Sequence, residues 1–383
     1  MKEGWESKKI KEVADVIGGS TPKTNVEEYW GGNNYWVTPA ELDGSKYIEK
    51  TVRCITSNAV DKTNLTLMPS GTVLLSSRAP IGKVCITKAP MYCNQGFKNL
   101  ICKELLYNEF AYYFLKHNVD YLQSLGTGAT FKEISKKVVE NVTIPVPPLS
   151  EQQHIVEELD LLSSIIDKKK AQLSELDNLA QSLFYEMFGD PITNEKGWEV
   201  KKIGEIGKVI TGSTPSTKDG GNYNSCDYCF IKPSDIAKDN ITRLFESEFY
   251  ISSKAYDNSR QLPKGSVLVT CIGIVGKVGI LEVNATCNQQ INAIVPHSFV
   301  QSQYLAYSIL LQKEIIESIA NAPVVPIINK KEFSSLSTPI PPLDLQNQFA
   351  SKIEAIEHQK ELIKQSIKEV ETLFNSRMDY YFN

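Results

Sequence analysis

Hydrophobic positions recur with alternating steps of four and three in two long segments that contain neither proline nor glycine. The first segment runs from Leu149 to Phe188 and the second from Leu343 to Phe382. This spacing is the heptad pattern of a helix whose apolar stripe must be covered by a partner helix. Pro147-Pro148 and Pro341-Pro342 precede the segments and mark the two helix starts, because proline cannot lie inside a helix. Each helix, at roughly 40 residues, is expected to be about 60 Å long.

The apolar stripe of the two helices forms a predicted coiled-coil seam. Lys169, Lys360 and Arg377 are the charged residues that fall on this stripe, where a charge lowers stability but fixes register and orientation. The seam consists of Ile155, Leu159, Leu162, Ile166, Leu173, Leu176 and Leu183 in the first segment, and of Phe349, Ile353, Ile356, Ile363, Ile367, Val370 and Phe374 in the second.

The second half of the chain repeats the first at a shift of 193 or 194 residues. Residues 5–22 match residues 198–215, and Cys93-Asn-Gln95 matches Cys287-Asn-Gln289. This period is far longer than the roughly 20–50 residues of solenoid repeats. The sequence therefore predicts two tandem copies of one globular domain, each followed by a long helix. The predicted boundaries are 1–143 for the first domain, 144–189 for the first helix, 190–337 for the second domain and 338–383 for the second helix.

Each globular half is predicted to be a mixed α/β domain, which gives an α+β chain. Lys8–Ile17 is expected to form a short amphipathic helix that ends at Gly18-Gly19. A longer helix is expected at Asn108–Leu125, with a counterpart at Ser302–Ala320. Predicted strands, bounded by Gly, Pro or Asn, lie at 72–77, 83–87 and 97–102 in the first half.

Composition indicates a soluble cytoplasmic protein. Hydrophobic residues make up 42% and charged residues 22% of the 383 residues. The chain has no run of 18 apolar residues that would span a membrane, and its start is not a signal peptide. Eight cysteines without a dense framework suit a reducing compartment.

The distribution of charge leaves room for a nucleic-acid partner, although the net charge is −4. Residues 149–189 carry 3 Lys and Arg against 8 Asp and Glu, whereas residues 1–148 carry 18 against 15. The acidity therefore lies on the long helices, and the globular domains can still present basic faces. Ordinary solvated lysines are the alternative interpretation of the clustered Lys132, Lys136 and Lys137 and of Lys330 and Lys331.

No catalytic or metal-binding motif is recognised in the sequence. Gly82-Lys83 and Gly276-Lys277 are each followed by Val, where a phosphate-binding loop needs Ser or Thr. The four histidines lack metal-ligand spacing, and Cys226-Asp-Tyr-Cys229 has no second pair. The amino-methyltransferase motif of Asn or Asp, two prolines and an aromatic residue is also missing. This pattern favours a binding module over an enzyme.

Several motifs, taken in their order, carry a family resemblance. They are the Gly-Ser-Thr-Pro turns at 19–22 and 212–215, Gly126–Thr130 followed by Lys132-Glu-Ile134, Pro-Pro-Leu-Ser-Glu-Gln-Gln at 147–153 and Phe188-Gly-Asp-Pro191. The whole chain thereby resembles the specificity subunit of type I restriction-modification systems. The second half departs from the pattern at Asp344-Leu-Gln346 and at Ala320–Val324, where Gly-Thr-Gly is lost.

The resemblance implies a division of labour between subunits. Each globular copy would be a target recognition domain that reads one half of a bipartite site in double-stranded DNA. The two helices would pair antiparallel as a spacer and dock two modification subunits, which carry S-adenosylmethionine. Restriction subunits with ATP and Mg would complete the complex, so this chain would hold no cofactor and no catalytic residue.

Positions that differ between the matched halves are the better candidates for reading bases. Arg78 matches Ile272, Gly96 matches Gln290 and Lys98 matches Asn292. Arg prefers guanine, and Asn or Gln prefers adenine. Features present in both halves are expected to serve the scaffold or phosphates. The candidate DNA-binding residues are Arg78, Lys83, Lys98, Lys132, Lys137, Lys277, Gln290, Asn292, Lys330 and Lys331.

Two other functions fit parts of the same pattern. A structural adaptor would use its heptad helices to dimerise and its globular ends to bind proteins. A methyltransferase fused to recognition domains would need a cofactor motif, yet the repeat already accounts for the whole chain. Specific retention of a split DNA site would separate the first alternative from a specificity subunit, and tight S-adenosylmethionine binding by this chain alone would favour the second.

Overall fold

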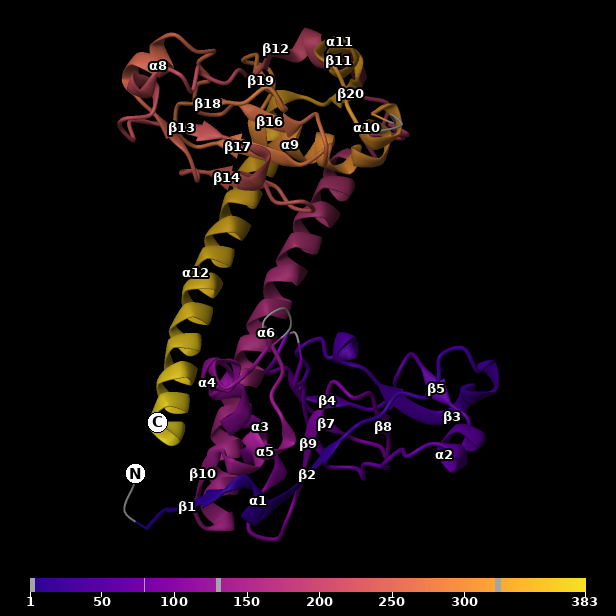
Figure 1. Ribbon diagram of the computed structural model, residues 1–383. Coiled ribbons are helices and arrows are strands. Elements are labelled where there is room, and N and C mark those ends of the chain that lie inside the picture. Colours follow the sequence, from indigo (N-terminus) through magenta and orange to yellow (C-terminus); the bar gives the residue numbers. More distant parts are fainter. Residues whose placement is uncertain (1–3, 79, 129–131, 321–324) are drawn as a thin grey trace. The chain divides into compact units, whose positions relative to one another are not determined.

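The computed structural model describes residues 4–78, 80–128, 132–320 and 325–383 (Figure 1). The chain forms two compact units, of which unit 1 comprises Met1–Lys168 and Ser366–Asn383, and unit 2 comprises Lys169–Gln365. Each unit therefore contains one globular domain and a section of each long helix.

Unit 1 contains a five-stranded sheet of order β2-β9-β6-β7-β4, a three-stranded sheet of order β5-β3-β8 and the pair β1-β10. Its strands are β1 (Glu6–Lys9), β2 (Ala14–Gly18), β3 (Trp30–Val37), β4 (Tyr47–Ile48), β5 (Cys54–Ile55), β6 (Val73–Leu75), β7 (Val84–Thr87), β8 (Tyr92–Cys93), β9 (Lys98–Cys102) and β10 (Thr143–Val146). Its helices are α1 (Ile10–Val13), α2 (Ser57–Lys62), α3 (Asn108–His117), α4 (Val119–Ser124) and α5 (Lys136–Asn141), with short 3-10 turns η1 (Glu27–Tyr29) and η2 (Pro39–Glu41).

Unit 2 repeats this topology, with sheets of order β12-β19-β16-β17-β14 and β15-β13-β18 and the pair β11-β20. Its strands are β11 (Glu199–Lys202), β12 (Gly207–Thr211), β13 (Tyr228–Ile231), β14 (Thr242–Leu244), β15 (Tyr250–Ile251), β16 (Val267–Thr270), β17 (Val278–Leu281), β18 (Ala285–Cys287), β19 (Ile291–Pro296) and β20 (Ser337–Ile340). Its helices are α7 (Ile203–Ile206), α8 (Ser253–Asp257), α9 (Ser302–Leu311), α10 (Lys313–Ile319) and α11 (Lys330–Ser335), with 3-10 turns η3 (Gly220–Asn222) and η4 (Pro233–Asp235).

The five-stranded sheet of unit 1 is buried on both faces. Val73 and Leu75 of β6 belong to the cluster that contains Phe110 of α3, whereas Leu74 between them belongs to a separate cluster with Phe97. Successive side chains of a strand point to opposite faces. Because both faces are covered, the strand is a continuous hydrophobic run rather than an alternating one.

The helix predicted at Lys8–Ile17 is wrong. The structure has strand β1 up to Lys9, a single helical turn in α1 and then strand β2, which pairs antiparallel with β9. Ala14 and Val16 are buried while Asp15 between them is exposed, which is the alternation of a strand. Pairing with β9 therefore overrides the helical spacing of the first few apolar residues.

The two longer predicted helices are each split at a matched position. Asn118 separates α3 from α4 and donates its side-chain Nδ2 to the carbonyl of Phe114 at 2.9 Å. Gln312 separates α9 from α10 in the same way and donates to the carbonyl of Ser308 at 3.1 Å. Both residues leave helical geometry, with ψ of 25° and 13°, and their side-chain amides satisfy carbonyls that the break exposes.

The long helices α6 (Leu149–Phe188) and α12 (Leu343–Phe382) coincide with the two segments that lack proline and glycine, and each has 40 residues. In unit 2, Asp177 of α6 pairs with Lys360 of α12, and Phe184 contacts Phe349, so the two helices run antiparallel. The fourteen predicted apolar seam residues are all buried or half-buried.

Aromatic contacts with the globular domain extend the seam in unit 2. Phe184 stacks on Tyr304 of α9 at a centroid distance of 5.5 Å, and Phe188 meets the same ring at 4.7 Å. The heptad pattern did not predict this second face of α6. Each long helix thus packs on its partner helix and on a sheet domain.

A buried glutamine fixes the start of each long helix. Gln152 accepts from the backbone N–H of Tyr107 at 2.8 Å and donates to the carbonyls of Leu105 and Pro147. Gln346 makes the matching contacts with Gln301, Phe299 and Pro341 in unit 2. Both side chains are fully buried, so these bonds satisfy polar groups that would otherwise be stranded in the core.

The charged seam residues differ in their surroundings. Lys360 is buried between Asp177 and Glu357, with its Nζ 2.7 Å from an oxygen of each carboxylate. Burial opposes the charged form, but the hydrogen bonds to Asp177 and Glu357 outweigh it and raise the pKa of Lys360. Lys169 is only half-buried on α6.

We therefore expect opposite effects from replacing these two lysines with leucine. Lys169→Leu should raise the melting temperature, because it completes an apolar stripe without removing a buried ion pair. Lys360→Leu should lower the free energy of unfolding by about 3 kcal/mol, because it leaves two half-buried carboxylates without their cation. Thermal and urea unfolding of the two variants measure this. A rise in stability for Lys360→Leu, or a fall for Lys169→Leu, would contradict the assigned seam.

Candidate nucleic-acid interface

One end of the five-stranded sheet gathers three chain segments in each domain. In unit 1, Gly18 at the end of β2 pairs with Lys98 at the start of β9. Ser76 after β6 pairs with Phe97, and the N–H of Ser77 donates to the carbonyl of Gly96 at 2.7 Å. The Gly-Ser-Thr-Pro turn, the Asn-Gln turn and the segment that carries Arg78 therefore meet at this sheet end.

The two turns are joined by the same contacts in both units. The backbone N–H of Ser20 donates to the carbonyl of Cys93, and that of Ser213 donates to the carbonyl of Cys287, each at 2.9 Å. The hydroxyl of Thr214 donates to Oε1 of Gln289 at 2.6 Å, and Thr21 makes the matching bond to Gln95.

Glycine is required where these turns approach each other. A Cβ at Gly19 would lie 2.0 Å from the carbonyl oxygen of Asn94, and a Cβ at Gly212 would lie 2.1 Å from that of Asn288. No side chain fits at such a distance, so the repeated Gly-Ser-Thr-Pro motif builds the scaffold of this sheet end.

Lys83 and Lys277 serve the same scaffold. Nζ of Lys83 donates to the carbonyls of Pro39 at 3.0 Å and Leu42 at 2.8 Å. Nζ of Lys277 donates to the matching carbonyls of Pro233 and Ile236, each at 2.8 Å. Both lysines were predicted to contact DNA, but their ammonium groups are engaged by their own domains, and this favours the structural role.

Unit 1 presents a charged cluster beside this scaffold. Arg78 pairs with Glu133 through Nε at 3.0 Å, and Lys98 reaches the other oxygen of Glu133 at 3.3 Å. Burial disfavours the carboxylate, but the bonds from Arg78 and Lys98 outweigh it and lower the pKa of Glu133. Glu133 therefore holds two candidate readers together as an ionised group, and the Arg78 side chain stays 48% exposed.

Unit 2 carries different side chains at the matched positions. Ile272 forms a bridge with Ile327, as Arg78 does with Glu133. Gln290 is half-buried and accepts from Nδ2 of Asn288 at 3.0 Å. Asn292 is only 1% exposed and accepts from the hydroxyl of Thr211 at 2.6 Å. Asn292 is thus enclosed within the five-stranded sheet, and its burial favours a structural role over the predicted direct DNA contact.

The remaining candidate lysines are exposed but spread out. Lys132 lies next to Glu133 at the sheet end, whereas Ala129 and Thr130 of the preceding motif lie outside the described residues. Lys137 lies on α5, and Lys330 and Lys331 lie in the first turn of α11, on helices that lead away from the sheet end. The structure thus brings together Arg78, Lys98 and Lys132, but not all of the predicted basic residues.

Sequence reasoning missed Glu133 and a pair of cation–aromatic contacts in the three-stranded sheets. Arg53 lies over Trp30 at 4.1 Å, and Lys232 lies over Phe249 at 3.0 Å from the ring centroid. Glu133 lies in the motif Lys132-Glu-Ile134, but its partners Arg78 and Lys98 are at least 35 residues away in the sequence, so no local spacing predicts these contacts.

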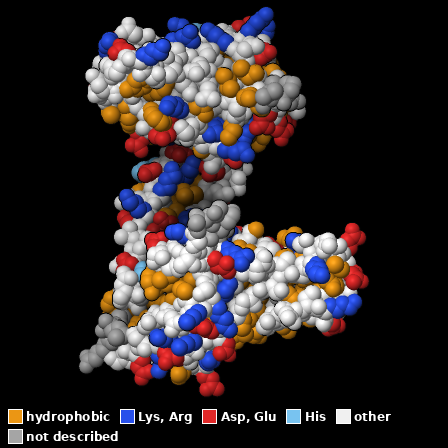
Figure 2. Space-filling model, in the orientation of Figure 1, with side chains coloured by type: hydrophobic (Ala, Val, Ile, Leu, Met, Phe, Trp, Pro, Cys, Tyr) orange, Lys and Arg blue, Asp and Glu red, His pale blue; other side chains and the backbone are white. Residues whose placement is uncertain are grey.

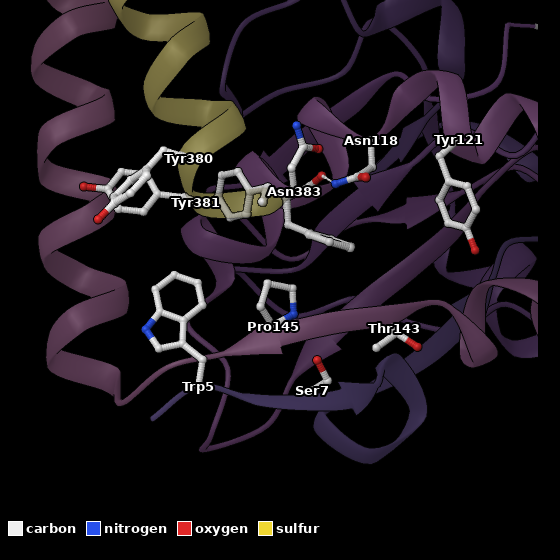
Figure 3. Close-up of a pocket in the computed structure, with 11 residues that line it drawn as sticks. Trp5, Ser7, Asn118, Tyr121, Thr143, Pro145, Tyr380, Tyr381 and Asn383 are labelled. Atoms are coloured by element: carbon white, nitrogen blue, oxygen red, sulfur yellow. Dashed lines mark hydrogen bonds between the residues drawn. The ribbon is translucent and has the colours of Figure 1, made fainter. Parts of the chain in front are cut away.

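A cavity of about 460 Å³ in unit 1 lies beside the end of α12 (Figure 3). Trp5, Tyr121, Tyr380 and Tyr381 are among the residues that line it, and none of the described lining residues is Asp, Glu, His, Lys or Cys. Burial, followed by a hydrogen bond to Glu158, raises the pKa of Tyr381 to about 12, so its hydroxyl is neutral at pH 7.

Among the residues that the structure describes, no cluster of three or more His, Cys, Asp or Glu is placed to hold a metal ion. No helix in that part of the chain is both long enough and apolar enough to cross a membrane. All eight cysteines are free thiols.

Residues 2–178 and 195–372 match the family model of the type I restriction modification DNA specificity domain. The chain belongs to this family. The type I restriction enzyme MjaIX specificity subunit of Methanocaldococcus jannaschii is 32% identical over 378 residues, which cover 92% of this chain and 86% of that subunit. The EcoR124I/EcoR124II specificity subunit of Escherichia coli is 31% identical over 173 residues, which cover 43% of each protein.

Solved structures share the fold of this type I specificity family member. The S subunit of a type I restriction-modification system from M. genitalium has a TM-score of 0.59 at 14% identity and covers 99% of this chain and 96% of its own. A chain solved in a study of complex assembly and conformational transition of the type I R-M system has a TM-score of 0.65 at 18% identity, covering 100% and 98%. The predicted fold and the predicted type I specificity subunit are both confirmed.

Proposed function

We propose that the chain is the DNA-reading subunit of a type I restriction-modification complex. Its two globular domains, residues 1–143 and 190–337, would each read one half of a bipartite site in double-stranded DNA. The observation that carries this proposal is the matched sheet end, where both domains share one scaffold but present different side chains. Two related readers on one chain suit two different half-sites, as the two halves of a dimeric repressor suit a palindrome.

The long helices, residues 144–189 and 338–383, are proposed to set the spacing of the half-sites and to dock two modification subunits. Apolar side chains outside the seam support docking: Leu161, Leu179, Leu362 and Leu373 are between 49% and 62% exposed. Exposed apolar residues on a monomer mark interaction sites when they gather.

The chain itself is proposed to be non-catalytic and to hold no cofactor. S-adenosylmethionine would be bound by the modification subunits, and ATP and Mg by restriction subunits. The match to the type I restriction modification DNA specificity domain and to named specificity subunits supports this assignment.

Methylome sequencing of a host that carries this gene with its partner genes tests the proposed function. A bipartite motif with one methylated adenine in each half is expected, and loss of the gene should abolish it. If the partner genes methylate the same motif without this chain, it is not the reader, and the adaptor function is favoured instead.

Arg78→Ala should relax recognition in the first half-site. The ion pair with Glu133 uses Nε of Arg78, so the other guanidinium N–H groups remain able to donate to guanine O6 and N7. We expect a loss of about 1–3 kcal/mol for the cognate site and a smaller loss for a duplex with a scrambled first half-site. Titrations with both duplexes measure the difference.

Two controls accompany Arg78→Ala. Lys103→Ala removes an exposed lysine just beyond the other end of β9 and should leave both affinities unchanged. Lys83→Ala should lower the melting temperature rather than the discrimination, because two backbone carbonyls lose their donor. Equal losses on cognate and scrambled DNA for Arg78→Ala would reject it as a base reader.

A heptad inserted at matched positions in both long helices should change the spacing of the half-sites. Seven residues add about 10 Å at 1.5 Å per residue, and the seam drifts by only about 20° per heptad, so the packed faces still meet. Along B-DNA this corresponds to about three base pairs. The same step rotates the second half-site by about three tenths of a turn, so weaker binding is also expected.

Methylation mapping of the insertion variant measures the result. Both half-sites should persist with a gap that is up to about three base pairs wider. Methylation that stays at the original spacing and never appears at a wider one would show that the helices do not set the gap.

A further inference from the structure

The matched sheet end of unit 2 carries an exposed apolar patch, which we define as Ile272, Ile274, Val325 and Ile327. Ile274 is 55% exposed, and Val325 and Ile327 are each 47% exposed. The two segments lie side by side, since Ile272 bridges Ile327 and the N–H of Gly273 donates to the carbonyl of Pro326 at 3.0 Å. Hydrophobic side chains reach the surface of this unit in Figure 2.

The scaffold does not require this patch to be apolar. In unit 1 the same bridge joins Arg78 to Glu133, and Pro80 stands where unit 2 has Ile274. The flanking bonds also match, because Ile134 donates to Ser77 and Ile328 donates to Cys271, each at 3.0 Å. The same backbone therefore carries an ion pair in one domain and exposed isoleucines in the other. The stability of the fold therefore does not require the Ile274, Val325 and Ile327 side chains to be exposed to water.

An amide side chain lies next to the patch. The N–H of Cys271 donates to the carbonyl of Gln290 at 2.7 Å, which places Gln290 beside the segment that begins at Ile272. The Gln290 side chain is half-buried and is oriented by Asn288. Unit 2 thus presents apolar groups where unit 1 has Arg78 and Glu133, and the Gln290 amide where unit 1 has Gly96.

We propose, on the basis of the proposed function, that this patch contacts the 5-methyl groups of thymines in the major groove. The thymine methyl is the apolar group that a base edge offers there, and an amide pairs with adenine N6 and N7. The second half-site therefore contains A·T pairs at positions where the first half-site contains G·C pairs. The patch contacts the thymine and Gln290 contacts the adenine, both on the major-groove edge of an A·T pair.

A protein partner is the other class of ligand that an apolar patch can bind. A specific protein interface uses about 20–30 residues on each side. This patch has four, and it lies at the sheet end of unit 2 that matches the one carrying the candidate base readers in unit 1. Its size and position favour base edges over a protein surface.

Replacement of thymine by uracil removes only the methyl group and tests the proposal directly. The full chain is purified with its modification partner, and its affinity is measured on duplexes of the mapped site. In one half-site at a time, uracil replaces each thymine except those opposite the methylated adenines. We expect uracil in the second half-site to weaken binding about fourfold per contacted methyl, and uracil in the first half-site to have no effect.

Variants of the patch complete the test. Ile327→Ala and Ile274→Ala should each bind the thymine duplex more weakly and lose part of the discrimination against uracil. Phe245→Ala is the matched control, because Phe245 is 59% exposed in the same unit but follows β14 at the far edge of the sheet. The control should keep the discrimination of the unchanged chain. Two isoleucine variants are used because the second still tests the proposal if the first fails to fold.

The remaining outcomes distinguish failure of the thymine contact from failure of the proposed function. If the split site is bound but uracil has no effect in the second half-site, or an equal effect in both, the thymine contact is wrong and the proposed function stands. A second half-site whose only A·T pair is the methylated one also overturns it. If Ile327→Ala releases the modification partner and leaves discrimination unchanged, the patch binds protein. If no split site is bound, the proposed function itself fails.

Discussion

Burial of the apolar stripe between α6 and α12 is the interaction on which this chain depends. A 40-residue helix with a one-sided heptad seam is not stable alone in water, so the two helices need each other. The pairing also completes the globular cores. Met378, Tyr381 and Phe382 from the end of α12 join the core of unit 1, and Phe184 and Phe188 from the end of α6 pack on unit 2. Each domain therefore borrows core residues from the helix that follows the other domain, which couples the two halves of the chain in folding.

The two copies of the domain share the residues that hold the scaffold together but differ in the side chains at the sheet end. Gly19 and Gly212, Lys83 and Lys277, and Gln152 and Gln346 make the same contacts in both units. The contrast lies at Arg78 and Glu133 against Ile272 and Ile327, where one backbone bridge carries opposite chemistry. A comparison of the two halves of one chain thus separates positions that keep the same contacts from positions that differ, and the differing positions are the proposed base readers.

The internal repeat and the long helices were predictable from the sequence. Features that depend on residues far apart in the chain were not. The repeat and the bounds of the long helices followed from heptad spacing and from the prolines at 147–148 and 341–342. The segment Lys8–Ile17 was mistaken for a helix because pairing of β2 with β9 decides its conformation. The scaffold contacts of Lys83 were not predictable, because the carbonyls that bind its ammonium group lie more than 40 residues earlier in the chain. Burial of Asn292 and the role of Glu133 likewise depend on neighbours that no local pattern reveals.

The central claim is that each domain reads its own half of a split DNA site. Hydroxyl-radical footprinting of the chain with its modification partner on the mapped site tests this most directly. Two protected segments with an unprotected gap are expected, and Arg78→Ala should weaken protection in the first segment while the second persists at matched occupancy. One continuous protected segment, or equal loss of protection in both segments at matched occupancy, would contradict independent reading by two domains.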